Sequence, residues 1–168
     1  MKRILVIGAS GAGKSTLARR LSDHLQLPVF PSDFFYWEPG WKISSSDRVR
    51  QQVRAVVCRE AWILDGNFDD EHDFVWKQAD CIIWLDYSLP TILKQVLVRN
   101  LRWVVTRQPT WSGNTMTLQR AMPGIWHAIK SYSLKRDKYP RWLAGLSGVT
   151  IYRFGTKQET ETWFQDLD

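Results

Sequence analysis

A glycine-rich turn near the start of the chain ends in two side chains that can act on a phosphorylated ligand. Residues 8–16 run GASGAGKST, which fits the pattern GxxxxGK[ST]. Glycines let backbone amides surround phosphate oxygens, the lysine reaches the β- and γ-phosphates, and the serine hydroxyl ligates Mg²⁺. We therefore expect Lys14 to be catalytic and Ser15 to be a magnesium ligand. The residues expected to bind the nucleotide here are Gly8, Ala9, Ser10, Gly11, Ala12, Gly13, Lys14, Ser15 and Thr16.

Two aspartates follow apolar runs in the first half of the chain. Asp65 ends the run WILD as a Walker-B carboxylate does, and a carboxylate beside a hydroxyl is the oxygen environment that Mg²⁺ prefers. Asp33 follows the short apolar run 27–30, where a carboxylate can orient or deprotonate an acceptor hydroxyl. For both residues the alternative is a structural role as a turn or helix cap. We expect Asp65 to be a magnesium ligand and Asp33 to be catalytic.

Asp86 ends another apolar run, ADCIIWLD. Ser88 and Pro90 follow it in the manner of a helix start, since serine caps helices and proline is tolerated in their first turn. Helix capping is therefore the expected role of Asp86.

An aromatic cluster comes directly after Asp33, in the segment FPSDFFYWEPGWK of residues 30–42. Its rings either stack on the ring of an acceptor or pack against the edge of the sheet, and the sequence leaves both alternatives open. The residues expected to hold the acceptor are Asp33, Phe35, Trp37, Trp41, Asp65, Gly66 and Asn67.

Short apolar runs alternate with helical patterns along the chain. Each run is apolar on both faces, which is typical of buried parallel strands. Five strands are expected, in residues 1–7, 27–30, 61–67, 80–86 and 148–154. Helices are expected from Lys14, from residues 44–46 to about Glu60, in 89–106 and 118–139, and after a capping box of Thr156 and Glu159.

This alternation predicts an α/β fold, a three-layer sandwich with a five-stranded parallel sheet. In such folds ligands lie beyond the carboxyl ends of the strands. The glycine-rich turn, Asp33 and Asp65 all follow strand ends. We therefore expect them to meet in one crevice.

Composition predicts a single domain spanning residues 1–168. The hydrophobic share of 44% and the charged share of 24% are ordinary globular values. Cys58 and Cys81 lack CxxC spacing and the histidines do not cluster, so no structural metal is expected. The first apolar run is too short for an export signal, and no run approaches the roughly 18 apolar residues of a membrane span. We expect a cytoplasmic protein.

The positive charge is concentrated in one segment. The chain carries a formal net charge of +6, and residues 87–142 hold ten Lys or Arg against one Asp. Such a block forms either a solvated face or a surface for phosphates or nucleic acid. Aromatic residues are interleaved with these cations, and they suit either base stacking or core packing: Trp103, Trp111, Trp126, Tyr132 and Tyr139.

Five segments together resemble the DNA topology modulation protein family, which is related to adenylate kinases and shikimate kinases. They are GASGAGKST, FPSDFFYWEPGWK, WILDGNF, ADCIIWLDYS and VTIYRFGTKQETETWF. The resemblance covers nearly the whole chain and implies an adenylate-kinase-like P-loop NTPase fold with a helical lid at about residues 99–141. It also implies ATP and Mg²⁺ as cofactors, with the base near Gly155 and Thr156.

The resemblance further implies that lid cations close over the transferring phosphate. Arg99 matches the relatives, and Arg99 and Arg136 are favoured as catalytic over the other candidates, Arg102, Arg107 and Lys135. Asp70 stands where relatives carry an arginine that grips the acceptor phosphate, which argues against a nucleoside monophosphate as acceptor. Gln95 stands where relatives carry an arginine that approaches the base.

The expected function is transfer of the γ-phosphoryl group of Mg-ATP to a small acceptor of the nucleoside or nucleotide type. One alternative is an ATP-dependent factor acting on or near DNA, because the basic aromatic segment suits phosphate contacts. Against it, the sequence has no helix-turn-helix, zinc or RRM pattern. The other alternative is a switch that only hydrolyses NTP. The sequence leaves the acceptor, the base specificity and the oligomeric state open.

Overall fold

The computed structural model describes residues 1–107, 110–115 and 117–167, without the side chains of residues 111 and 118–122. Five parallel strands form its central sheet in the order β2-β5-β1-β6-β7. The strands are β1 (Arg3–Gly8), β2 (Val29–Pro31), β5 (Trp62–Asp65), β6 (Cys81–Leu85) and β7 (Thr150–Phe154). The five strands and the parallel sheet expected from the apolar runs are confirmed.

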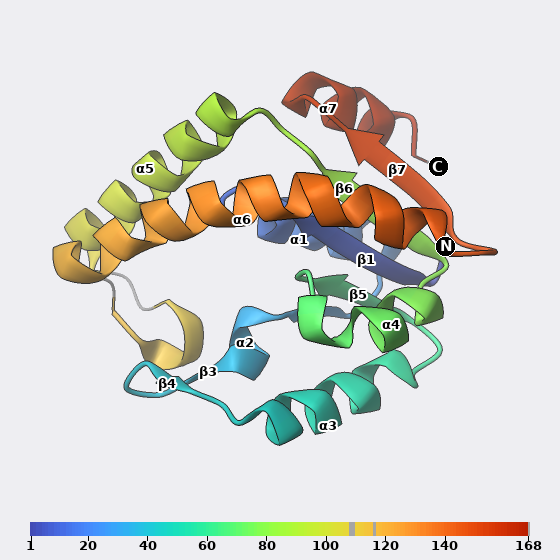
Figure 1. Cartoon of the computed structure of the whole chain (residues 1–168), viewed down its shortest axis with the longest axis horizontal. Coiled ribbons are helices and arrows are strands. Elements are labelled where there is room, and N and C mark those ends of the chain that lie inside the picture. Colours follow the sequence, from blue (N-terminus) through green and yellow to red (C-terminus); the bar gives the residue numbers. More distant parts are fainter. Residues whose placement is uncertain (108–109, 116, 168) are drawn as a thin grey trace.

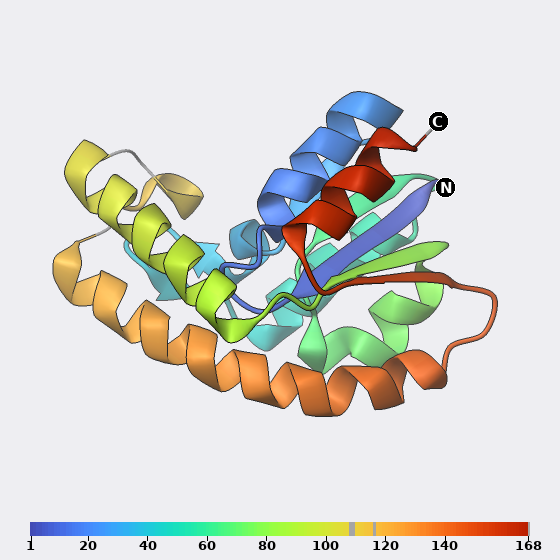
Figure 2. The same ribbon diagram turned by 90° about the horizontal axis from the view of Figure 1, so that it is seen from above.

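Helices cover both faces of the sheet. Figure 2 shows α1 (Lys14–Leu25) and α7 (Lys157–Gln165) above it, and α3 (Ser46–Val57), α4 (His72–Val75) and α6 (Leu118–Ala144) below it. Alternate residues of β1 supply both cores, because successive side chains of a strand point to opposite faces. Ile4 and Val6 pack with α1, and Leu5 and Ile7 pack with α3. The three-layer sandwich is confirmed.

Two helices begin at capping residues of the kind expected from the sequence. The Ser45 hydroxyl accepts a hydrogen bond from the Arg48 N–H at the start of α3, and Thr156 accepts one from the Glu159 N–H at the start of α7. The Glu159 carboxylate in turn accepts the Gly155 N–H over 2.9 Å. The capping box expected before the last helix is therefore confirmed.

The helix expected to end near Tyr139 continues to Ala144, so that boundary was wrong. Proline in a helix interior removes one backbone hydrogen bond, but α6 continues through Pro140. Tyr139 and Leu143 lie one turn apart and are both buried in the core beneath the sheet. Their burial offsets the lost hydrogen bond.

The aromatic segment after Asp33 folds into elements that the sequence did not predict. A one-turn helix, α2 (Asp33–Tyr36), leads into an antiparallel hairpin of β3 (Trp37–Glu38) and β4 (Lys42–Ile43). Three short 3₁₀ turns, η1 (Asp69–Glu71), η2 (Trp76–Gln78) and η3 (Trp111–Gly113), were also not predicted. Such elements are too short for a periodic pattern.

Helix α5 (Leu89–Thr106) has the bounds expected from the sequence and packs against α6. Both helices extend past one end of the sheet, on the left of Figure 1, and η3 lies between them in the chain. Residues 108, 109 and 116 of the expected lid lie outside the described residues. None of the helices in the described part of the chain has the length and apolarity to span a membrane.

Candidate active site

The glycine-rich turn joins β1 to α1 at the middle of the sheet. Gly13 precedes α1 in the left-handed region, at φ 95°, and glycine adopts that conformation without strain. No side chain caps the helix, and its first turn contains no acidic residue. The first amides of a helix lack internal partners and carry positive partial charge. The start of α1 is therefore suited to a phosphate group.

The Lys14 ammonium lies over this turn. Its Nζ donates hydrogen bonds to the carbonyl oxygens of Gly8 and Ala9, both over 3.1 Å. Burial lowers the pKa of Lys14, while the nearby carboxylates of Asp65 and Asp33 act in the opposite direction. Lys14 is therefore a desolvated cation held beside the amides that would receive phosphate oxygens.

Asp65 lies at the end of β5, next to the first turn of α1. The Ser15 hydroxyl donates a hydrogen bond to its carboxylate. Burial raises the pKa of Asp65, and Lys14 and Ser15 oppose that shift. Asp65 and Ser15 are the two residues expected to bind Mg²⁺, and the fold brings them into contact.

The oxygen donors present fit a magnesium ion. No group of three or more His, Cys, Asp or Glu side chains that could hold a metal occurs among the described residues. Mg²⁺ is typically bound through one or two protein oxygens together with waters and substrate phosphates. A single carboxylate beside a hydroxyl and a phosphate cradle satisfies that requirement, so Asp65 and Ser15 would hold the ion.

Asp33 is the first residue of α2 and faces the same lysine. Burial raises the pKa of the Asp33 carboxyl to about 6, with Asp65 acting in the same direction and Lys14 and Arg99 against it. These influences show that the charges of Asp33, Lys14, Asp65 and Arg99 lie close together. The residues expected to meet at the carboxyl ends of the strands are thus brought together from β1, β2 and β5, with α5 contributing the arginine.

Arg99 reaches this group from the middle of α5. Its guanidinium lies over the Trp103 ring, 4.8 Å from the centroid, and burial lowers its pKa while Asp33 opposes the shift. The Arg99 Nε is buried and has no hydrogen-bond partner among the described residues. Arg99 therefore carries donor capacity that the protein itself does not use.

Arg136, the other favoured arginine, lies elsewhere. It donates to the Tyr132 hydroxyl over 2.7 Å and lies 3.3 Å from the Asp86 carboxylate. Asp86 also accepts two hydrogen bonds from Arg153, the shorter of them 2.6 Å. The capping role expected for Asp86 was wrong, because its carboxylate is buried between two arginines.

Lys135, the residue before Arg136, lies near Lys14, where a lid cation was expected. Lys135 is buried, lies 3.7 Å from the Asp69 carboxylate, and is close enough to Lys14 for their charges to interact. Burial is the main cause that lowers the pKa of Lys135 to about 8. The sequence placed Lys135 among the lid cations but did not favour it over Arg136.

Gly66 and Asn67 support the crevice from below. The Asn67 Oδ1 accepts the Gly8 N–H over 2.9 Å, and its carbonyl oxygen accepts the Trp76 indole N–H over 2.8 Å. A Cβ on Gly66 would overlap the Ser32 side chain, at a φ of 154°. Both residues were expected to hold the acceptor, but their contacts here hold the glycine-rich turn and the strand ends.

The aromatic residues after Asp33 divide between two surroundings. Phe35 packs against Phe68, with centroids 6.1 Å apart, in the core beneath the sheet. Trp37 and Trp41 meet edge to face at 5.3 Å in the hairpin. Packing is therefore the role of Phe35, whereas the two tryptophans belong to the hairpin described next.

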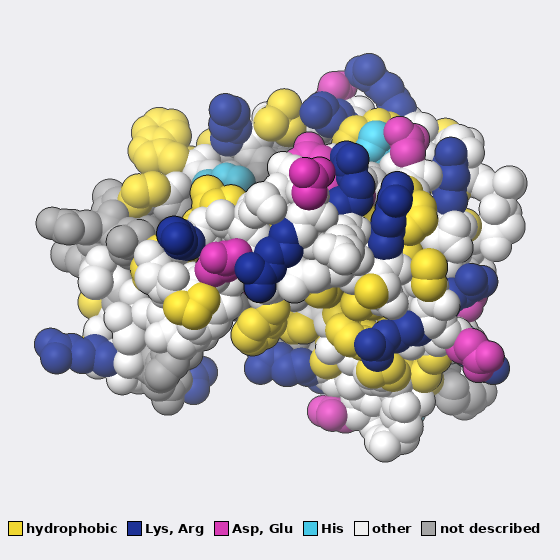
Figure 3. Space-filling view, turned by 90° about the horizontal axis from the view of Figure 1, so that it is seen from below, with side chains coloured by type: hydrophobic (Ala, Val, Ile, Leu, Met, Phe, Trp, Pro, Cys, Tyr) yellow, Lys and Arg dark blue, Asp and Glu magenta, His cyan; other side chains and the backbone are white. Residues whose placement is uncertain are grey.

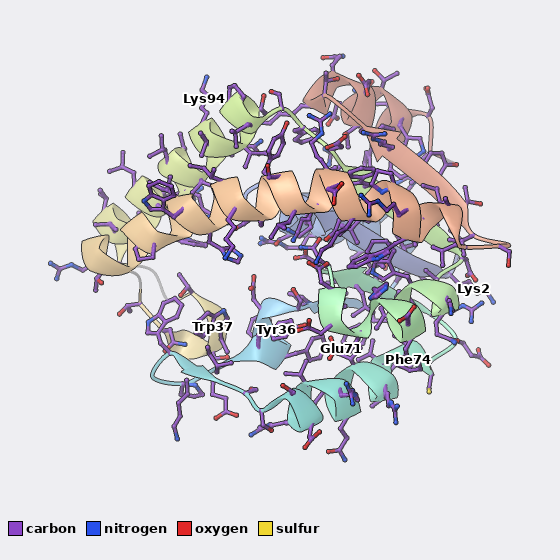
Figure 4. All side chains as sticks on the ribbon, viewed as in Figure 1. Lys2, Tyr36, Trp37, Glu71, Phe74 and Lys94 are labelled. Carbon is purple, nitrogen blue, oxygen red and sulfur yellow. The ribbon has the colours of Figure 1, made fainter. Side chains whose placement is uncertain are left out.

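The hairpin is bonded to residues 110–115 of the insertion between α5 and α6. The Asn114 side chain accepts the Trp41 N–H over 2.9 Å and donates to the Glu38 carbonyl oxygen over 3.0 Å. The Ser112 hydroxyl donates to the Trp37 carbonyl oxygen over 2.5 Å. Figure 4 labels Trp37 beside this turn, on the same side of the molecule as α2.

Tyr36 and Glu71 form a buried pair that the sequence did not identify. The Tyr36 hydroxyl donates to Glu71, and burial raises the pKa of both groups. Figure 4 shows Tyr36 directed from α2 toward Glu71. The pair joins the start of the aromatic segment to η1.

Gly155 and Thr156 lie at the start of α7, where both bond to Glu159. Their expected role beside a nucleotide base stays a prediction. Trp111 and residues 118–122 lie outside the side chains that the structure describes.

Comparisons with known proteins place this fold among small kinases. No protein-family model matches the chain. Over 113 residues it is 27% identical to a shikimate kinase of Sulfurihydrogenibium sp. (strain YO3AOP1), across 57% of this chain and 67% of that protein. Over 86 residues it is 30% identical to the uncharacterized protein YqaC of Bacillus subtilis (strain 168), across 50% of this chain and 48% of that protein.

Solved structures resemble nearly the whole chain. A shikimate kinase from Bacteroides thetaiotaomicron has a TM-score of 0.62 at 17% identity, covering 98% of this chain and 95% of its own. A shikimate kinase from Acinetobacter baumannii in complex with shikimate gives 0.57 at 17%, covering 99% and 90%. A gluconokinase from Sinorhizobium meliloti 1021 gives 0.53 at 12%, covering 98% and 88%. The chain has the fold of these P-loop kinases; membership of the DNA topology modulation family is not shown.

Proposed function

We propose that the protein is a P-loop kinase that transfers the γ-phosphoryl group of Mg-ATP to a hydroxyl group of a small acceptor. The observation that carries the proposal is the approach of Asp33 to Lys14, Arg99 and Asp65 at one end of the sheet. An NTP-hydrolysing switch needs the lysine and the Walker-B carboxylate. A second carboxylate, buried beside them, is what an acceptor hydroxyl requires.

Sequence similarity supports the same class of reaction. The chain is similar to a shikimate kinase and shares its fold with another and with a gluconokinase. Shikimate and gluconate are both small hydroxylated acids. We infer a small hydroxylated acceptor here as well.

Each residue of the crevice has a distinct role in the proposal. The amides of residues 8–16 and Lys14 bind the nucleotide phosphates, and Ser15 with Asp65 holds Mg²⁺. Asp33 orients the acceptor hydroxyl and takes its proton as the bond to phosphorus forms. Arg99 donates a hydrogen bond to the transferring phosphoryl group through its Nε, which has no partner among the described residues. Bound Mg-ATP supplies the activated phosphoryl group, and its Mg²⁺ neutralises part of the negative charge on that group.

The remaining assignments extend this proposal. The base lies near Gly155 and Thr156, residues 99–141 act as the lid, and the protein is cytoplasmic. Arg136 would act on the phosphoryl group only after leaving Asp86, so Lys135 replaces it as the favoured lid cation. Trp37 and Trp41 line the acceptor side through the hairpin.

A role on nucleic acid is less well supported by the one face of the molecule that Figure 3 draws. Figure 3 shows one face of the molecule, on which Lys and Arg are spread among Asp, Glu and apolar side chains rather than gathered in a stripe. Of the interleaved aromatics, Tyr139 is fully buried, whereas Trp126 is 73% exposed. Phosphate tracking along a strand requires a continuous basic groove with exposed rings.

ATP consumption with Mg²⁺ tests the proposal across a panel of nucleosides, nucleoside monophosphates, shikimate, gluconate, sugar alcohols and DNA. The Lys14→Ala variant, checked by circular dichroism for an intact fold, is the blank. We expect one small acceptor to stimulate turnover, with ADP and phosphorylated product in equal amounts. Acceptor-independent release of inorganic phosphate would instead favour the switch, and stimulation by DNA alone would favour the nucleic-acid factor.

A further inference from the structure

A cavity of about 250 Å³ lies against the long helix α6, beside the active site. Asp69 of η1 and five residues of α6 supply its polar lining: His127, Lys130, Ser131, Lys135 and Lys138. Lys135 and Ser131 are each more than nine-tenths buried. These two polar groups are therefore held in place by the fold, whereas His127, Lys130 and Lys138 are exposed.

The charges of this lining do not balance. Three lysines face the cavity, and Asp69 is the one carboxylate among its lining residues. Asp69 is already engaged, because its Oδ1 accepts the Tyr139 hydroxyl over 2.8 Å and its Oδ2 lies 3.7 Å from the Lys135 ammonium. Lys135 is buried, whereas Lys130 and Lys138 line the cavity from exposed positions. The excess of positive over negative charge around the cavity is suited to an anionic ligand.

The cavity is close to the phosphate site. The charge of Lys14 lowers the pKa of both Lys135 and His127, in addition to the effect of burial on each. The cavity is nevertheless lined by α6 and η1 and not by the glycine-rich turn. An anion bound there would lie within the influence of the Lys14 charge without occupying the phosphate cradle.

We propose that this cavity binds an anionic group of the acceptor, a carboxylate or a phosphate, through Lys135 with Lys130 and Lys138. The inference rests on the proposed kinase function and narrows it to acceptors that carry both a hydroxyl group and a negative charge. With this site, the acidic Asp70 no longer argues against an anionic acceptor. A cationic acceptor site need not include an arginine at position 70 when α6 provides the lysines.

An added anion can bind in the cavity or at the site of the nucleotide phosphates, and the experiment separates the two. The protein is first saturated with Mg²⁺ and a non-hydrolysable ATP analogue, so that the glycine-rich turn is occupied. Inorganic phosphate, shikimate and the neutral polyol sorbitol are then titrated by calorimetry. We expect phosphate or shikimate to bind under these conditions and sorbitol to bind more weakly than either.

The test variant is Lys135→Gln, and its matched control is Arg141→Gln. Arg141 lies on the same helix, is exposed and pairs with Asp137, so the control removes the same charge outside the cavity. Loss of one charged hydrogen bond weakens binding by about tenfold or more. We expect that loss in Lys135→Gln and less than about twofold change in the control. Lys130→Gln, at an exposed position on the cavity wall, is the second variant if Lys135→Gln unfolds.

Two results would overturn the proposal. One is anion binding that is equally strong in Lys135→Gln, Lys130→Gln and the control. The other is anion binding that disappears when the glycine-rich turn is filled, because the site would then belong to the nucleotide. Binding that depends on Lys135 in a protein without any acceptor-dependent turnover would leave the anion site standing and reject the kinase function.

Discussion

The Asn67 amide oxygen accepts a hydrogen bond from the Gly8 N–H over 2.9 Å and so fixes the first residue of the phosphate-binding turn to the end of β5. The carbonyl of the same residue is held by the Trp76 indole. The turn is therefore shaped before any nucleotide arrives.

Replacing this amide should weaken nucleotide binding without unfolding the chain. In Asn67→Ala the Gly8 N–H loses its partner, which costs about 1–3 kcal/mol. We expect the Kd for Mg-ATP to rise by about tenfold, measured by calorimetry. Asn67→Asp keeps an acceptor at the same place but adds a negative charge near the phosphates. If Asn67→Ala binds Mg-ATP as tightly as the unmodified protein, the hydrogen bond does not shape the turn.

The rate should depend on the ionisation of Asp33. Its carboxyl has a pKa of about 6, so it accepts a proton above that pH and is neutral below it. We expect kcat/KM to fall about tenfold per pH unit below pH 6 and to level off above it. A pH profile in which the acid limb has its midpoint near 4 would show that the base is another carboxylate.

Arg99 should affect both the rate and that midpoint. The positive charge of Arg99 lowers the pKa of Asp33. Arg99→Gln should therefore reduce kcat by about a hundredfold or more and move the acid limb to higher pH. Arg99→Lys keeps the charge and should retain the midpoint while losing much of the rate. A rate loss in Arg99→Gln with an unmoved midpoint would show that the Arg99 charge does not act on Asp33.

The ligand-free protein should become more stable when Asp33 loses its charge. The folded pKa is raised above the unfolded value, so the favourable contribution of this group is complete below about pH 4 and is lost as the pH rises through 6. Asp33→Asn should therefore be more stable than the unmodified protein by about 1–3 kcal/mol at about pH 8, and equally stable at about pH 4. Urea unfolding at both pH values measures the difference, and an equal gain at the two would refute the electrostatic cause.

Gly66 should tolerate no side chain at its position. A Cβ there would overlap the Ser32 side chain. We expect Gly66→Ala to lower the stability by about 1–3 kcal/mol, which corresponds to roughly 2–12 °C in Tm for a chain of this length. Ser32→Gly combined with Gly66→Ala should recover part of the loss, as a thermal melt of the two variants would show. Without such recovery, the backbone conformation rather than the overlap would be the cause.

The parts of the site that were predicted are those fixed by the sheet. Apolar runs gave the five parallel strands, and parallel strands present their carboxyl ends at one edge, so Ser15, Asp33 and Asp65 had to meet there. The strand order did not fix whether Lys135 or Arg136 faces the site. Neighbouring residues of a helix point about 100° apart, and the side that faces the crevice depends on how α6 crosses the sheet. Packing of Tyr139 and Leu143, not the charge pattern, decides that orientation.

Asn67 illustrates a second limit. Its amide acts on Gly8, which is 59 residues away in the chain, through a contact that exists only when β1 and β5 are neighbours. Residue type and spacing predicted Asn67 among the residues that hold the acceptor. They carried no information about which of its groups would bond to the protein and which would remain for a ligand.

The bonds between the hairpin and residues 110–115 have a consequence for engineering. Trp37, Glu38 and Trp41 are held by Ser112 and Asn114, from a segment more than seventy positions further along the chain. A graft of either loop alone from a relative would leave backbone donors and acceptors of the other without partners. The hairpin and residues 110–115 therefore form one bonded unit, and we expect chimeras that exchange both together to keep their shape.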